Sequence, residues 1–179
     1  MANVLVVVDY QNDFVDGSLG FERAVALEPG IAQRVEKALS DGWKVMFTRD
    51  THPADYLTTR EGQFLPVVHC VKGTPGWQLF ASLHQYEQTS NPQVAIVDKP
   101  TFGSPLVAQA VQELCGGEPE QIEICGLVSN ICVVSTAIML HSTFLNSSIS
   151  ILEQLCAAPN PQDHDNTMKL LAGMGYHII

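Results

Sequence analysis

The sequence predicts an α/β fold with three layers, in which helices cover both faces of a doubly wound, six-stranded parallel sheet. Short apolar runs rich in β-branched residues alternate with longer mixed segments along the whole chain. The first run, residues 3–8, is almost continuously apolar, which is typical of a strand buried on both faces of a parallel sheet. No internal repeat interrupts the alternation. The 179 residues therefore favour a single domain, 1–179, with a large core.

Six strands and four longer helices are expected from this pattern. The strands are predicted at residues 3–8, 44–48, 94–97, 122–126, 149–152 and 176–179, and the helices at 29–42, 104–115, 130–145 and 164–174. Residues 11–21 are rich in Gly, Asp and Asn, which indicates a loop. Residues 51–92 show few periodic features. A stretch that long without clear elements is usually functional, so we expect part of the site to come from it.

Composition and charge exclude several classes of protein. The formal net charge is −10, and the nine Lys and Arg residues form no cluster, which argues against a nucleic-acid or anionic-membrane surface. The five cysteines contain no CxxC pair, so neither a zinc ribbon nor a secreted disulfide framework is indicated. The apolar run at the N-terminus lacks a basic flank and is cut short by Asp9, as expected for a first strand in a cytoplasmic protein.

Four residues of chemical interest directly follow predicted strands. They are Asp9, Asp50, Lys99 and, after the turn at 127–130, Cys132. In a doubly wound fold the ligand site lies beyond the carboxyl ends of the strands. Two acids, a base and a thiol are therefore expected at one edge of the sheet.

The turn before Cys132 gives this thiol a candidate role as a nucleophile. Residues 121–136 are predicted as a strand, a sharp turn and a helix, with the thiol in the first helical turn. Unpaired N–H groups and the positive dipole end at a helix start favour a thiolate over a thiol. Ser129 is expected to cap this helix, with Asn130 as the alternative. The alternative is that Cys132 is one more buried cysteine of the core.

Cysteine acyl transfer needs a group that moves the thiol proton and N–H donors for the oxyanion. Asp9 is a candidate acceptor of that proton, and Lys99 a candidate partner of Asp9 or of the thiolate. Backbone N–H groups of residues 127–132 are candidate oxyanion donors. The alternatives left open by the residues alone are a capping or loop carboxylate for Asp9 and a solvated surface charge for Lys99.

A second cluster has the residue types of a metal site. Asp50 and His52 are two positions apart after a strand, so an extended chain would point both side chains to one side. His69 follows in the same long segment, and Glu61 lies between them as a possible fourth ligand. An Asp and two His residues suit zinc, iron or manganese. The other histidines, at 84, 141, 164 and 177, are predicted to be surface or packing residues.

Five motifs occur together in order: VVVDYQNDFVDGSLG at 6–20, TRDTHP at 48–53, HCVKGTPG at 69–76, DKPTF at 98–102 and GLVSNICVVSTA at 126–137. Together they resemble the isochorismatase-like cysteine hydrolase family, and within it the nicotinamidase/pyrazinamidase-like branch. The resemblance implies a strand order of 3-2-1-4-5-6.

The same resemblance assigns residues to roles. It places an Asp-Lys-Cys triad on Asp9, Lys99 and Cys132, and oxyanion N–H donors on Val128 and Cys132. It places a cis peptide bond at Leu127–Val128. The implied metal ligands are Asp50, His52 and His69, with Glu61 as a further candidate and zinc as the favoured ion. The implied pocket lining is Phe14, Leu19, Leu65 and Ile131.

The implied activity is that of a metal-assisted cysteine amidohydrolase. Such an enzyme cleaves a small carboxamide to an acid and ammonia through a thioester, and relatives are often homo-oligomers. Aromatic residues that are common in nicotinamidases are replaced here by Thr51, Pro66 and Ile131. An N-carbamoyl or ureido compound is therefore the alternative substrate class. A binding protein with an inactive site is a further alternative, against which the complete triad argues. A nucleotide binder is disfavoured because no glycine fingerprint follows the first strand.

Overall fold

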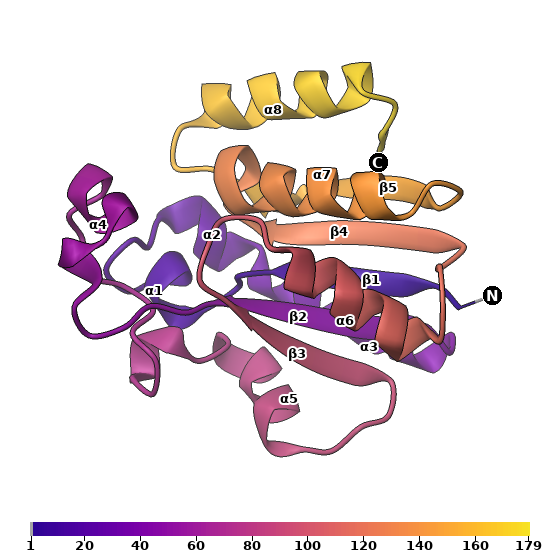
Figure 1. Ribbon diagram of the computed structural model, residues 1–179, viewed down its shortest axis with the longest axis horizontal. Coiled ribbons are helices and arrows are strands. Elements are labelled where there is room, and N and C mark those ends of the chain that lie inside the picture. Colours follow the sequence, from indigo (N-terminus) through magenta and orange to yellow (C-terminus); the bar gives the residue numbers. More distant parts are fainter. Residues whose placement is uncertain (1) are drawn as a thin grey trace.

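The computed structural model describes residues 2–179 and contains a six-stranded parallel sheet of order β3-β2-β1-β4-β5-β6 (Figure 1). The strands are β1 (Val4–Val8), β2 (Lys44–Asp50), β3 (Val94–Lys99), β4 (Gln121–Leu127), β5 (Ser148–Ala157) and β6 (His177–Ile178). The predicted fold class, the number of strands and the order implied by the resemblance are all confirmed.

The position of β1 at the centre of the sheet explains why its sequence is continuously apolar. It pairs in parallel with β2 on one side and with β4 on the other, so that Val6 lies opposite both Met46 and Ile124. Every residue of β1 is fully buried. A strand covered on both faces has no solvent side on which polar residues would alternate, and the sequence shows none.

The helices form the outer layers. The longer ones are α3 (Glu28–Ser40), α6 (Pro105–Cys115), α7 (Val134–Thr143) and α8 (Pro161–Gly173). Figure 1 shows α6 and α7 in front of the sheet, α3 behind it and α8 along the β5 side. Opposite faces are expected for α3 and α6, because right-handed crossovers change face when the strand order reverses after β3.

Short helices occupy the segments predicted as loops. Residues 10–26 contain α1 (Asn12–Val15) and α2 (Glu22–Ala26). The long segment 51–92 contains η1 (Tyr56–Thr58), α4 (Arg60–Phe64), η2 (Pro75–Trp77), η3 (Ala81–His84) and α5 (Gln85–Gln88). Each of these has three to five residues, too few for a helical period to stand out in the sequence.

Two predicted boundaries were wrong for identifiable reasons. Helix α8 begins at Pro161 rather than at residue 164, because the Asn160 side chain accepts a hydrogen bond from the Gln162 N–H at 3.0 Å and caps an earlier start. Strand β5 continues to Ala157 rather than ending at residue 152, because it pairs with β4 as far as Leu127.

The predicted helix 130–145 consists of two parts. Residues Ser129–Val133 form a π-helical turn, η4, in which the Val133 N–H reaches back five residues to the Val128 carbonyl at 3.2 Å. The α-helix α7 follows directly. Cys132 therefore lies in the π-helical turn and not in the first turn of an α-helix.

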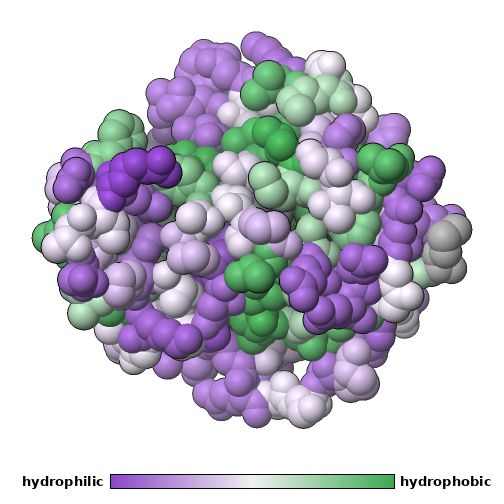
Figure 2. All heavy atoms as spheres, in the orientation of Figure 1, coloured by the Kyte–Doolittle hydropathy of each residue, from purple (hydrophilic) through white to green (hydrophobic). Residues whose placement is uncertain are grey.

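The carboxyl ends of the strands carry the irregular segments. Figure 1 shows α1, α4 and the start of α7 grouped at this edge. The face carrying α6 and α7 shows apolar and polar residues interspersed (Figure 2). Among residues 2–179, no helix has the length and apolar character that crossing a membrane requires.

Candidate active site and metal-binding group

Three side chains at the carboxyl edge form a buried polar cluster. Asp9 and Lys99 are both fully buried, and the Lys99 Nζ lies 2.6 Å from Asp9 Oδ2. The other Asp9 oxygen accepts a hydrogen bond from the Thr48 hydroxyl at 2.6 Å. Lys99 is thus a buried partner of the Asp9 carboxylate and not a solvated surface charge.

Asp9 ends β1 in a left-handed backbone conformation, with φ of 46°. Its N–H donates to the Thr48 carbonyl at 3.2 Å, which fixes this residue between β1 and β2. On the other side of β1, the pairing with β4 ends where Gly126 lies opposite Val8. Gly126 has a φ of 116°, and a Cβ there would overlap the Val8 carbonyl oxygen. Glycine is therefore required where β4 passes Val8, the residue of β1 just before Asp9.

Cys132 joins this cluster from the π-helical turn. Its side chain is buried, and burial raises the pKa of the thiol well above the ordinary value. The Lys99 ammonium opposes this rise, while the charges of Asp9 and Asp50 and a hydrogen bond with Asp9 add to it. The expectation of a thiolate favoured by a helix start is thus wrong for the metal-free protein. The neutral thiol lies beside a carboxylate able to accept its proton.

The charges of Asp9 and Lys99 are set by each other. Burial raises the pKa of Asp9, and the Lys99 ammonium lowers it without cancelling that rise. Burial lowers the pKa of Lys99, and the Asp9 carboxylate more than reverses this, so the net pKa is raised. Lys99 therefore remains a cation, and Asp9 is a better proton acceptor than an exposed aspartate.

The turn before Cys132 carries the expected cis peptide bond at Leu127–Val128. Within residues 2–179, the Val128 N–H has no hydrogen-bond acceptor. The Val128 N–H, in the turn before Cys132, is therefore free to donate to an oxyanion.

Ser129 has a different partner from the one predicted. Its side chain makes no cap for the following turn. It lies 2.7 Å from the His164 Nδ1, which joins the turn to the start of α8. The predicted capping role of Ser129 is wrong, and His164 is a packing residue with a specific hydrogen-bond partner.

The four candidate ligands of a metal ion come together as one group. Asp50, His52, Glu61 and His69 each offer an atom within 4.8 Å of the others. His52 Nε2 lies 2.9 Å from Asp50 Oδ2 and 3.4 Å from Glu61 Oε1, and His69 Nε2 lies 3.4 Å from Asp50 Oδ2. The strand β2 supplies Asp50, and helix α4 brings Glu61 back toward it.

Three observations indicate that these four residues are suited to hold a metal ion. Asp50 Oδ1 and Glu61 Oε1 are buried without a hydrogen-bond partner. The His69 Nδ1 lies 2.8 Å from the Val67 carbonyl, which leaves Nε2 facing the group, as is usual for metal-binding histidines. A buried set of two carboxylates and two imidazoles has the donor chemistry of zinc, iron or manganese sites.

Without a metal ion, protons and ion pairs hold the group together. Burial lowers the pKa of His52, but its hydrogen bond with Asp50 and the Glu61 carboxylate 3.4 Å away outweigh this and raise the pKa to about 9. Burial raises the pKa of Asp50, and the two histidines and Lys99 hold it well below its usual range. Tyr56 packs against His52 with ring centroids 4.4 Å apart, and its hydroxyl donates to the Leu65 carbonyl.

The predicted pocket residues surround different parts of this edge. Phe14 packs edge-on against His69, with ring centroids 5.3 Å apart. Leu19 and Ile131 are half-buried against the core, and Leu65 is half-buried after α4. A cavity of about 230 Å³ opens beside the metal-binding group, and its lining includes His52, Glu61, Arg60 and Thr101. None of the four predicted residues lines this cavity, so their role stays a prediction.

Two residues outside the predicted site, Gln11 and Asp13, position the candidate metal ligands. Gln11 is fully buried; its Oε1 accepts from the Asp50 N–H at 2.7 Å, and its Nε2 donates to the Asp50 carbonyl at 3.0 Å. Asp13 accepts from the Cys70 N–H at 2.8 Å, next to His69. A Cβ at Gly76 would overlap the Asp13 carboxylate, so a larger residue there would displace this carboxylate from the Cys70 N–H. Their signal in the sequence was their spacing from Asp9, at alternate positions of one loop.

Comparisons with known proteins place the chain in a family. The sequence profile of the Isochorismatase domain matches residues 3–179. The nicotinamidase/pyrazinamidase of Mycobacterium tuberculosis is 29% identical over 147 residues, which cover 74% of this chain and 75% of that protein. The crystal structure of nicotinamidase/pyrazinamidase PncA from Bacillus subtilis has a TM-score of 0.87 and 25% identity, with 99% of each chain covered.

A third relative resembles the chain in fold. The pyrazinamidase of Pyrococcus horikoshii, solved in complex with zinc, has a TM-score of 0.81 and 22% identity, covering 100% of this chain and 99% of that one. Because the Isochorismatase profile spans nearly the whole sequence and the fold agrees throughout, this chain belongs to the isochorismatase family.

Proposed function

We propose that this protein is a metal-assisted cysteine amidohydrolase that cleaves a small carboxamide to the acid and ammonia. The observation that carries the proposal is the buried cluster in which the Cys132 thiol lies beside the Asp9–Lys99 pair. Relatives named nicotinamidase or pyrazinamidase in the same family support hydrolysis of an amide C–N bond. Nicotinamide is therefore the first substrate to test.

In the proposed mechanism Asp9 accepts the thiol proton as the Cys132 sulfur attacks the carboxamide carbon. The carbonyl π electrons move to oxygen, and the N–H groups of Val128 and Cys132 hold the resulting oxyanion. When the tetrahedral intermediate collapses, the C–N bond breaks and Asp9 returns the proton to the departing ammonia. A water molecule then attacks the thioester carbon and gives up a proton to Asp9. The C–S bond breaks, the acid leaves, and Asp9 returns the proton to the Cys132 sulfur, which restores the thiol.

Lys99 has an electrostatic role in this mechanism. Its ammonium holds Asp9 in the charged form before attack and stabilises the thiolate character that develops on Cys132 during attack. Both effects require the contact of 2.6 Å with Asp9 and the exclusion of water from the cluster.

Asp50, His52, Glu61 and His69 are the residues proposed to hold a divalent cation, with zinc favoured and iron or manganese as alternatives. When bound, such an ion would supply Lewis acidity and an anchor for a ring nitrogen or carboxylate of the substrate. His52 and Glu61 would face the cavity from this group, and Gln11 would keep the Asp50 main chain in place.

One observation favours N-carbamoyl or ureido acids as a second substrate class. Arg60 lines the cavity beside His52 and Glu61, is exposed, and forms no ion pair with a residue of the described chain. A free guanidinium at that position suits a substrate carboxylate. Nicotinamide has no such group.

Ammonia release separates the two classes. The purified protein, with its metal content measured, would be assayed with nicotinamide, pyrazinamide and a series of N-carbamoyl amino acids, with Cys132→Ala as the control for background hydrolysis. Arg60→Gln should leave nicotinamide turnover nearly unchanged and raise KM for N-carbamoyl acids. Lack of activity on every amide and ureide would contradict the proposal and favour a binding protein. A homo-oligomeric state and a cytoplasmic location stay predictions, and size-exclusion chromatography would test the first.

A further inference from the structure

A second cavity, of about 510 Å³, lies beside the outer part of β5. Strand β6 pairs only with Ser150 and Ile151, and the Glu153 N–H donates to the Ile179 carbonyl, so the edge of β5 beyond Glu153 is not covered by another described strand. The starts of α2 and α8 form the walls around this uncovered edge. Its volume is within the usual range for small-molecule sites. It shares no lining residue with the proposed triad or the metal-binding group.

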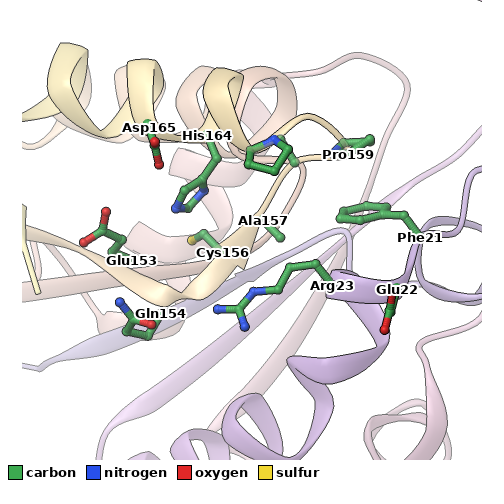
Figure 3. A pocket seen from close by; sticks show the side chains of 12 residues that line it. Phe21, Glu22, Arg23, Glu153, Gln154, Cys156, Ala157, Pro159, His164 and Asp165 are labelled. Carbon is green, nitrogen blue, oxygen red and sulfur yellow. The ribbon is translucent and has the colours of Figure 1, made fainter.

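Charges of both signs line this cavity from three separate elements. Glu22 and Arg23 come from α2, Glu153 from β5 and Asp165 from α8. None of these four forms an ion pair with another residue in the described part of the chain. Figure 3 shows the Arg23 guanidinium and the His164 imidazole both extending into the space beside Cys156.

The mixture of charges selects among ligands. A simple anion attracted by Arg23 would also meet the carboxylates of Glu153 and Asp165. A simple cation attracted by those carboxylates would meet Arg23. A molecule with a carboxylate and an ammonium group satisfies both signs at once, because each of its charges finds an opposite partner.

The opposite end of the cavity is mostly apolar, with Glu22 beside Phe21 as its charged residue. Figure 3 shows Phe21 and Pro159 away from Glu153 and Asp165, and Ala157 and Ala158 also line the cavity. The thiol of Cys156 contributes no charge, because burial raises its pKa to about 12. A ligand that fits both ends therefore has a zwitterionic head and an apolar side chain.

We propose that this cavity binds a small zwitterion with an apolar side chain, of the class of free α-amino acids. Its carboxylate would pair with Arg23, its ammonium with Glu153 and Asp165, and its side chain would pack against Phe21. This site goes beyond the amidohydrolase activity and does not depend on it, since binding is measured without turnover.

Isothermal titration calorimetry with L-leucine tests the proposal on the full-length protein. Two single-charge analogues of the same shape, 4-methylpentanoate and 3-methylbutylamine, separate recognition of the zwitterion from burial of the side chain. L-Leucine should bind, and each analogue should bind about tenfold more weakly or worse, because one charged group loses its partner. Equal affinity for L-leucine and either analogue would overturn the proposed recognition.

Variants locate the binding site. Arg23→Gln and Glu153→Gln should each weaken L-leucine binding about tenfold, since each removes one charge-assisted contact. Lys169→Gln and Glu36→Gln change the same charges at exposed positions outside the cavity and should leave affinity unchanged. Ala158→Phe, which narrows the cavity without altering its charges, should also abolish binding. Undetectable binding of L-leucine at millimolar concentration, or binding unaltered in Arg23→Gln, would overturn the proposal.

Discussion

Replacing Lys99 by methionine should destabilise the protein and slow catalysis through one cause, the loss of the cation beside Asp9. The two charges are fully buried with their atoms 2.6 Å apart. At an effective dielectric constant of about 20, their gross attraction is about 6 kcal/mol, most of which offsets the cost of removing both charges from water. Removing one partner leaves the other uncompensated, and typically costs about 3–5 kcal/mol.

The remaining carboxylates determine how the Lys99→Met variant responds. Lys99 also lies 3.8 Å from Asp50, so its loss leaves two buried acids near each other. Because Lys99 lowers the pKa of Asp9, the variant should hold Asp9 protonated near neutral pH and unable to accept the thiol proton. Urea unfolding measures the stability change, and ammonia release measures the loss of kcat.

A double-mutant cycle with Asp9→Asn distinguishes this cause from general damage to the core. The double variant carries no uncompensated charge at position 9, so it should be more stable than the sum of the two single losses predicts. Additive losses, or a urea midpoint of Lys99→Met equal to that of the wild type, would refute the reasoning.

Two further predictions concern the metal-binding group. Gln11→Met removes both side-chain hydrogen bonds to the Asp50 main chain and should weaken zinc binding about tenfold in a chelator competition, whereas the exposed Gln63→Met should not. The pKa of His52 in the metal-free protein, about 9, is above its ordinary value of 6.5. Its ion pairs therefore stabilise the metal-free fold fully below about pH 6.5 and are lost as the pH rises through about 9. The urea midpoint of chelator-treated protein should fall across that window, and a similar fall in His52→Gln would exclude His52 as the cause.

The sequence was sufficient to predict the fold and the convergence of the site, because both depend on strand order. Once β1 to β4 are parallel neighbours or near neighbours, the residues after their carboxyl ends must meet at one edge. Asp9 and Lys99 come together for this reason, although 89 positions, from 10 to 98, separate them in the chain. The cluster of four candidate metal ligands was recognisable from its residue types.

What the sequence could not predict depends on packing in three dimensions. The pKa of Cys132 is raised because the thiol is enclosed, and no local pattern encodes that enclosure. The role of Gln11 depends on a partner 39 positions away, and that of Asp13 on one 57 positions away. The link between Ser129 and His164 spans 35 positions and replaces the local cap that helix-start rules predict.

The proposal that Cys132 forms a thioester is tested most directly by intact-protein mass spectrometry of samples quenched in acid during turnover of the best amide substrate. The wild-type protein should gain the mass of the substrate's acyl group, and hydroxylamine should remove it. Cys132→Ala removes only one buried atom, the sulfur, so the variant should keep the fold. It should gain no mass and release no ammonia above background. Full ammonia release by Cys132→Ala, or an acyl group mapped to another residue, would contradict the mechanism.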